Sequence, residues 1–202
     1  MPDYRKLAEG TAEQREQIDD TTVDRDLTEQ LMNIKTAIAE LREILFFKGM
    51  IAGDVFYKVA QETRFTPEET SLTPRVRWDE RYGTPSFSWE RTHRRAYPLG
   101  PESQINTVNG KGRSYIAKVR RKKSGLTEKM KIVLVSEHIS VNSTTHRVSD
   151  KNFSNEPEWA QISASIVEDQ FCELRKLNRS LATISKALTH AQSLHIKNEK
   201  EA

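Results

Sequence analysis

Eight basic residues crowd into the stretch from Arg113 to Val135, and only Glu128 offsets their charge. We expect this stretch to fold as a β-hairpin, which would place a dense positive field on an ordered element. Such a field favours a polyanion as the binding partner. The alternative is a solvated basic surface without a ligand. The eight residues are Arg113, Lys118, Arg120, Arg121, Lys122, Lys123, Lys129 and Lys131.

Base-edge contacts are expected from four arginines that precede this run, Arg75, Arg77, Arg94 and Arg95. The arginine fork matches the two acceptors that guanine presents in the major groove of DNA. The basic run itself, with its tip at Arg121–Lys123, is expected to contact phosphates, which position a protein without reading sequence. The complete set of predicted DNA-binding residues is Arg75, Arg77, Arg94, Arg95, Lys111, Arg113, Lys118, Arg120, Arg121, Lys122 and Lys123.

Catalytic motifs are missing from the sequence. The five histidines include no His-x-His pair and no His-Glu-x-x-His helix, the usual ligand patterns of metal-assisted nucleases and relaxases. The glycines around Lys111 fail the phosphate-loop pattern, because no Ser or Thr follows the lysine. His138 and His146 share one polar stretch, but such clusters are mostly surface features. We therefore expect no enzyme activity, no catalytic residue, no metal and no cofactor.

The net charge of +3 hides an asymmetry along the chain. Residues 1–73 carry 9 Lys and Arg against 15 Asp and Glu, residues 74–151 carry 17 against 7, and residues 152–202 carry 6 against 7. A basic middle therefore lies between acidic flanks, which bears on partners and not on fold. With 202 residues, of which 36% are hydrophobic and 30% charged, the chain suits one domain with long exposed helices.

The cellular compartment is predicted from cysteine usage and from the apolar runs. The single cysteine, Cys172, cannot form an internal disulfide, and no Cys/His cluster has zinc spacing. The N-terminus lacks an apolar signal core, and the run from Ile44 to Gly53 is interrupted by Lys48 and too short for a bilayer. These features predict a soluble, unprocessed, cytoplasmic protein without a membrane partner.

Residues 1–20 are polar and acidic, and we expect them to be mobile. A helical region is predicted over 21–65, between a capping signal at Thr21 and the breaker Thr66-Pro67. Gly49 and Gly53 weaken this helix, so it either kinks or breaks there or continues through both. Its apolar residues recur every 3.5 positions on average, which gives a heptad-like stripe of Leu27, Leu31, Ile34, Ile38, Leu41 and Leu45.

A basic β-rich region is predicted over 74–151. Two alternating runs around the turn Tyr82–Pro85 form a hairpin, followed by a loop over 92–101. Asn109-Gly110 marks a second hairpin between 104–108 and 111–119, and 129–136 supplies the next strand. In the first hairpin, one face is expected to carry Val76, Trp78, Phe87 and Trp89 as core residues, and the other Arg75, Arg77, Ser86 and Ser88.

The last element is a long helix within 155–195, predicted to run from Glu156 to about His190. Asn155 and Glu158 have capping-box spacing, and Pro157 falls in the first turn. The two long helices either pack antiparallel on each other or one pairs with its copy, and we expect a homodimer. The second stripe consists of Leu174, Leu177, Leu181, Ile184 and Leu188.

The order of these segments resembles the MobI family of conjugative transfer proteins. The features that carry the resemblance are Arg77-Trp78, Ser86–Trp89, the basic strands, Ser136–Ser140, and Glu158-Trp159 at the start of a Glu-rich helix. The similarity covers roughly residues 70–190. It implies an auxiliary factor of a bacterial integrative conjugative element or plasmid, which recognises the origin of transfer and helps the relaxase begin DNA processing.

The sequence therefore predicts an α+β fold with a small, mainly antiparallel sheet of hairpins flanked by long N- and C-terminal helices. We expect a DNA-binding auxiliary protein of conjugative transfer, with duplex origin DNA and a relaxase or other transfer proteins as partners. A helical protein–protein adaptor with weak nonspecific DNA affinity is the alternative. RNA binding is disfavoured, because few aromatic residues fall on the predicted basic face.

Overall fold

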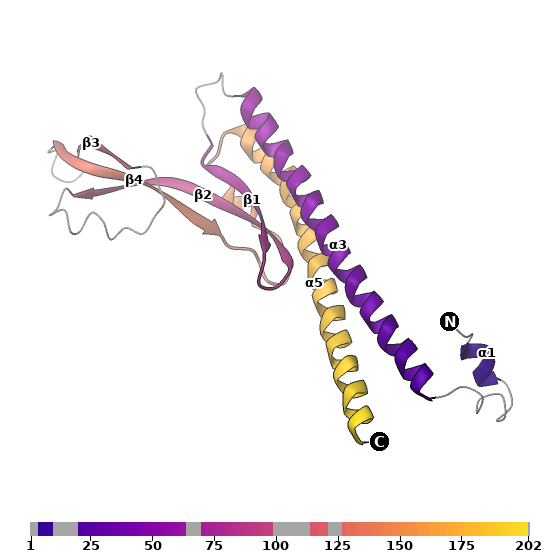
Figure 1. Ribbon diagram of the computed structural model, residues 1–202. Coiled ribbons are helices and arrows are strands. Elements are labelled where there is room, and N and C mark those ends of the chain that lie inside the picture. The colour runs from indigo at the N-terminus through magenta and orange to yellow at the C-terminus, as the bar shows by residue number, and fades with distance from the viewer. Residues whose placement is uncertain (1–3, 10–19, 64–69, 99–113, 121–126, 202) are drawn as a thin grey trace.

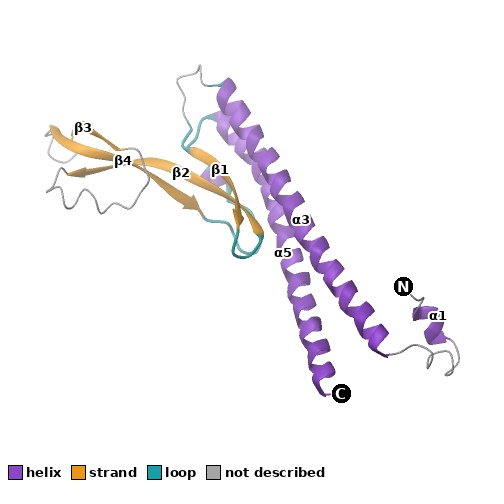
Figure 2. Ribbon diagram, viewed as in Figure 1, coloured by secondary structure: helices purple, strands orange, loops and turns teal. Residues whose placement is uncertain are grey.

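Two long helices lie side by side, and a four-stranded sheet packs against one side of the pair (Figure 1). This computed structural model describes residues 4–9, 20–63, 70–98, 114–120 and 127–201. The long helices are α3 (Asp20–Glu62) and α5 (Glu158–Glu201), and a short α1 (Tyr4–Glu9) precedes them. The predicted α+β class, with a small sheet flanked by long helices, is confirmed (Figure 2).

The sheet is antiparallel throughout, in the order β1-β2-β4-β3. The longest strand, β2, is shared between two partners: its first half pairs with β1 and its second half with β4. The strands are β1 (Leu72–Asp79), β2 (Thr84–Pro98), β3 (Ser114–Arg120) and β4 (Thr127–Ile139).

Both helices contact β2, and α3 also contacts β1. The other end of the sheet extends away from the helix pair (Figure 1). We call this extension the β arm and define it as residues 92–98 of β2, 127–136 of β4, and β3. A loop with one 3-10 turn, η1 (Asp150–Asn152), then leads back to α5.

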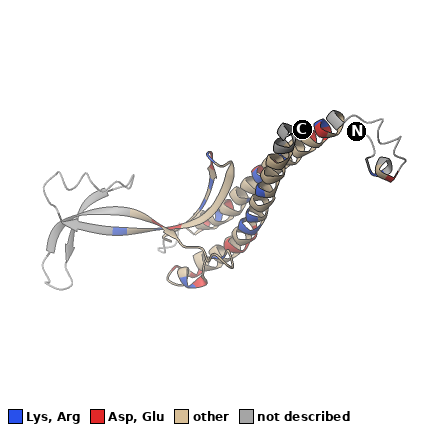
Figure 3. Ribbon diagram, turned by 90° about the horizontal axis from the view of Figure 1, so that it is seen from below, with Lys and Arg blue, Asp and Glu red and all other residues tan. Residues whose placement is uncertain are grey.

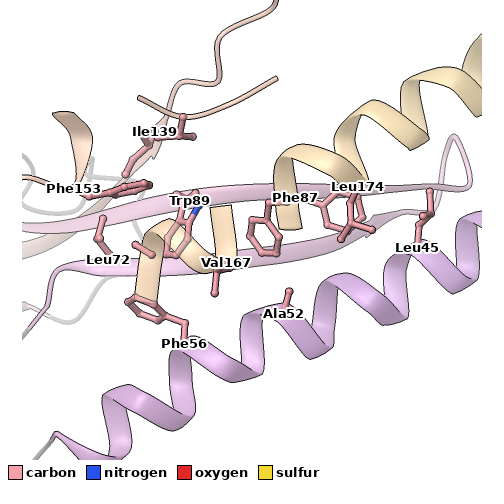
Figure 4. Packing of buried hydrophobic residues seen from close by; sticks show 13 residues of the cluster. Leu45, Ala52, Phe56, Leu72, Phe87, Trp89, Ile139, Phe153, Val167 and Leu174 are labelled. Carbon is pink, nitrogen blue, oxygen red and sulfur yellow. The ribbon is translucent and has the colours of Figure 1, made fainter. Parts of the chain in front are cut away.

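The first hairpin has the predicted faces. Val76 is the register partner of Phe87, and Arg75 is the partner of Ser88. Trp89 is fully buried, as predicted, and packs edge-on against Phe56 at 5.3 Å between ring centroids (Figure 4). The core position predicted for Trp78 is only half realised, because this side chain is partly buried against Phe46, at 5.6 Å between ring centroids.

The loop predicted over 92–101 is wrong over most of its length, because β2 continues to Pro98. The pairing of β2 with β4 runs without a bulge from Trp89↔Ile139 to Pro98↔Met130. A strand with such a partner satisfies its backbone groups, and this outweighs the polar composition that indicated a loop. The strand predicted over 104–108 and the turn at Asn109-Gly110 lie outside the described residues.

Of the alternatives left open for the N-terminal helix, the structure shows the continuous one, since α3 runs unbroken through Gly49 and Gly53. Gly49 instead provides room for the sheet. A Cβ at this position would lie 2.3 Å from Phe87 Cε1 and 3.2 Å from Val76 Cγ1. The missing side chain therefore allows close packing of helix on sheet.

Of the two helix arrangements predicted, the structure shows the antiparallel pair within one chain. Phe56 lies 6.0 Å from Trp159 between ring centroids, and Thr28 Oγ1 lies 3.1 Å from His195 Nε2 at the other end. The helix α5 begins later than predicted and continues past His190 to Glu201. Within the segment predicted to be mobile, α1 is a helix.

Candidate nucleic-acid interface

The register of β3 and β4 gathers basic positions on one side of the β arm. Lys118 is the direct partner of Lys129, and Arg120 lies two residues farther along β3. Lys131 lies two residues from Lys129 on β4. Alternate residues of a strand share a face of the sheet. Arg95 of β2 lies on the same side as these four positions. We call the five positions the basic face: Arg95, Lys118, Arg120, Lys129 and Lys131.

No acidic position of the arm lies within the basic face. Glu128, which offsets the charge of this segment in the sequence, is the partner of Val119 and therefore belongs to the opposite face. Lys118 and Lys129 occupy directly opposite positions of an antiparallel pair, where like charges are destabilising. A bound polyanion would relieve this repulsion.

Of the four arginines predicted to read bases, three lie on the side opposite to the basic face, and only Arg95 lies on the basic face. Arg75 and Arg77 lie on the side opposite to the basic face, and both bind Glu90. Arg75 Nε donates to Glu90 Oε2 at 3.0 Å, and Arg77 Nη2 donates to Glu90 Oε1. Glu90 is only 9% exposed. Its partly desolvated carboxylate therefore compensates part of the positive charge of Arg75 and Arg77.

Arg94 lies on the same side as Arg75 and Arg77 but farther out, opposite Leu134, where its side chain is exposed. Its neighbour Arg95 belongs to the basic face, because successive strand residues alternate sides. The remaining predicted residues lie outside the described part of the chain: Lys111, Arg113, Arg121, Lys122 and Lys123.

A buried carboxylate holds the root of the sheet on α5. Glu168 is fully buried, and its Oε2 accepts a hydrogen bond from Trp89 Nε1 at 2.8 Å. Its Oε1 accepts from the backbone N of Val148 at 2.7 Å and from Arg175 Nη1 at 2.7 Å. Arg175 Nε in turn donates to the carbonyl of Phe87 at 2.8 Å. One network thus joins α5, β2 and the loop after β4.

A second carboxylate ties the start of β1 to the segment before α5. Glu156 accepts from the backbone N of Ser71 at 2.9 Å and from Thr70 Oγ1 at 2.9 Å. Arg91 Nε lies 3.6 Å from the same carboxylate. The side chain of Glu156 thus holds the segment just before α5, which begins at Glu158, against the start of β1.

Glu90, Glu168 and Glu156 were missed as site or bracing residues. For Glu90 a signal existed, because the alternation in the first hairpin puts it on the same face as Arg75 and Arg77. For Glu168 the spacing to Arg175, seven residues along the same helix, was a local signal, but its partners on β2 and in the loop after β4 come from 79 and 20 residues away in the chain.

The helices differ from the β arm in charge. Both long helices carry acidic and basic residues (Figure 3). On α5 the acidic residues come first, from Glu158 to Glu173, and the basic ones follow, from Arg175 to Lys197. Among the described residues, no group of three or more His, Cys, Asp or Glu could hold a metal ion. None of the helices in this part of the chain is long and apolar enough to cross a membrane.

Comparison with known proteins leaves the chain unassigned to any family. Searches of protein-family models, curated proteins and solved structures found no match.

Proposed function

We propose that this chain binds duplex DNA through the basic face of the β arm. The observation that carries the proposal is the register of β3 on β4, which aligns Lys118 with Lys129 and puts Arg120 and Lys131 on the same side. Four cationic positions on one side of two paired strands suit the regularly spaced negative charges of a polyanion better than scattered surface charges do. Lys and Arg at such positions bind phosphates and release condensed counterions.

The shape of the arm favours duplex DNA over other polyanions. The major groove of B-DNA admits a two-stranded β-ribbon. The arm extends away from the helix pair, so the helices do not cover it (Figure 1). The Glu168 network holds the sheet on α5 at the base of the β arm. The arm therefore has less conformational freedom to lose when it binds DNA.

We further propose that the DNA is an origin of transfer and that the chain assists relaxase recruitment. This step rests on the resemblance of the segment order to the MobI family. Of the arginines predicted to read bases, Arg95 is best placed to reach a base edge, because its position belongs to the basic face. Arg75 and Arg77 would first have to leave Glu90.

A helical adaptor with only weak DNA affinity is the second candidate. It is favoured by the large apolar residues that remain exposed on α3 and α5, among them Phe47 at 67%.

A competition experiment separates the two functions. The labelled probe is a short duplex from a candidate origin of transfer, and the competitor is random duplex of equal length. We expect the specific complex to survive at salt concentrations that abolish binding to random DNA. Equal loss of both complexes at every salt concentration would favour the adaptor.

A further inference from the structure

A row of large apolar side chains stays exposed on each long helix, on the side away from the sheet. Their exposed fractions lie between 39% and 67%. On each helix they recur at spacings that keep them on one stripe, since three, four, seven or eleven residues complete nearly whole turns. We call them the outer helix face: Ile44, Phe47, Ile51 and Val55 on α3, and Ile162, Ile166, Leu177 and Ile184 on α5.

Contacts with the sheet fix the direction of this face. Gly49 of α3 and Arg175 of α5 both contact Phe87 of β2. Ile51 and Leu177 each lie two residues farther along, which turns a helical side chain by about 200°. The sheet and the outer helix face therefore occupy opposite sides of the helix pair.

The two stripes belong to one continuous surface. Ile51 of α3 and Leu177 of α5 line the same groove, whose volume is about 300 Å³. Lys48 and Glu173 lie at the same groove, and among the described residues neither forms an ion pair. The groove thus combines apolar side chains with one charge of each sign, Lys48 and Glu173.

We propose that the outer helix face binds the same face of a second copy of this chain, so that four helices form a bundle. Eight half-exposed side chains of this size present on the order of 700 Å² of apolar surface. This exceeds the roughly 300–600 Å² of the largest patch on a typical monomer and approaches the ~800 Å² per partner of a stable interface.

Charge complementarity identifies a second copy as the occupant. A two-fold interface brings the same patch of both copies together, so each surface must complement itself. Lys48 and Glu173 meet this requirement, because a two-fold axis through the groove lets Lys48 of each copy face Glu173 of the other. The sheets lie on the far sides of such a bundle, which leaves both β arms accessible. This proposal does not depend on the proposed DNA binding.

Sedimentation equilibrium of the full chain tests the proposal. The wild type is expected to be a dimer at tens of micromolar protein. Ile51→Asp and Leu177→Asp are each expected to weaken the dimer at least about 30-fold, with unchanged helical circular dichroism. Met32→Asp, at an exposed apolar residue of α3 outside this face, is the matched control and should remain dimeric.

Charge reversal distinguishes a second copy from another partner and does not rely on an apolar position. Lys48→Glu and Glu173→Lys should each weaken the dimer by about tenfold, and the double variant should restore it. A monomeric wild type would overturn the proposal, and so would folded Ile51→Asp and Leu177→Asp variants with unchanged dimer affinity. If the double variant instead lost as much dimer affinity as the two single variants together, Lys48 and Glu173 would not pair across the interface.

Discussion

Glu168 and Arg175 form a buried ion pair within α5, with Glu168 Oε1 2.7 Å from Arg175 Nη1 and exposed side-chain fractions of 0% and 10%. Seven residues separate them, so they lie two turns apart on one side of the helix. Each also bonds to β2, Glu168 through Trp89 and Arg175 through Phe87. The pair therefore connects the sheet to the helix that supports it.

Removing one partner of this pair should destabilise the fold strongly. Glu168→Gln leaves the Arg175 charge buried without a counterion, and we expect a loss of about 3–5 kcal/mol in the free energy of unfolding. Urea denaturation followed by circular dichroism measures it. The control is Asp169→Asn, which breaks the neighbouring pair between Arg147 and the exposed Asp169 and should cost no more than about 1 kcal/mol. Equal losses in both variants would contradict the role of the buried pair.

The two glycines of α3 should respond oppositely to alanine. Gly49→Ala places a Cβ 2.3 Å from a ring carbon of the buried Phe87, and we expect a net loss of about 1–3 kcal/mol from overpacking. Gly53→Ala meets nothing within 4 Å, so the gain in helix propensity should stabilise the protein by about 0.5–1 kcal/mol. Thermal denaturation of both variants compares them. Stabilisation by Gly49→Ala would show that the sheet does not pack so closely on α3.

Tyr57 should make stability fall at high pH. Burial raises the pKa of Tyr57 above its usual value of 10.0, and its hydroxyl donates to the carbonyl of Pro74 at 3.1 Å. The unfolded chain ionises this group first, so the contribution of neutral Tyr57 is complete below pH about 10 and is lost above it. Tyr57→Phe should therefore lose less stability than the wild type between pH 9 and about 10.5.

Urea midpoints at these two pH values measure the difference. Tyr82→Phe is the control, because Tyr82 is 62% exposed. Equal pH dependence of the wild type and Tyr57→Phe would exclude a role for Tyr57.

Sequence discrimination should depend on Arg95 more than on Arg75. Arg95→Ala is expected to cost about 1–3 kcal/mol on a cognate duplex and much less on random DNA, as a base-edge contact would. Arg75→Ala should change discrimination less, because its guanidinium is bound to Glu90 on the opposite side of the sheet. Fluorescence anisotropy with both duplexes measures the two affinities. The assignment fails if Arg95→Ala weakens both duplexes equally.

Alternation and apolar spacing predicted the fold class, the first hairpin and both long helices. These features depend on local periodicity, which the sequence displays directly. The loop over 92–101 was predicted wrongly because the pairing of β2 with β4 joins residues far apart in the chain. The role of Gly49 was missed for the same reason, since only the position of Phe87 reveals it.

The candidate site was predicted in composition but not in arrangement. Charge counting identified the basic run, yet it could not tell that Glu128 falls on the face opposite to Lys118 and Lys129. It also grouped Arg75 and Arg77 with the run, although they lie on the other side and bind Glu90. Face assignment across three strands requires a register, which spacing within one strand does not provide.

The salt dependence of DNA binding tests the central claim most directly. In one variant, Lys118, Arg120, Lys129 and Lys131 are replaced by alanine. In a control variant with the same change in net charge, four exposed helix lysines are replaced: Lys35, Lys58, Lys176 and Lys186. Affinity for random duplex is measured by fluorescence anisotropy over a range of salt concentrations, and circular dichroism confirms that both variants are folded.

Each phosphate contact contributes about −0.9 to the slope of log affinity against log salt. If the basic face binds DNA, the first variant should lose affinity and about three to four units of slope, while the helix variant stays close to the wild type. Equal slopes for the wild type and the first variant, or equal losses in both variants, would contradict binding through the basic face.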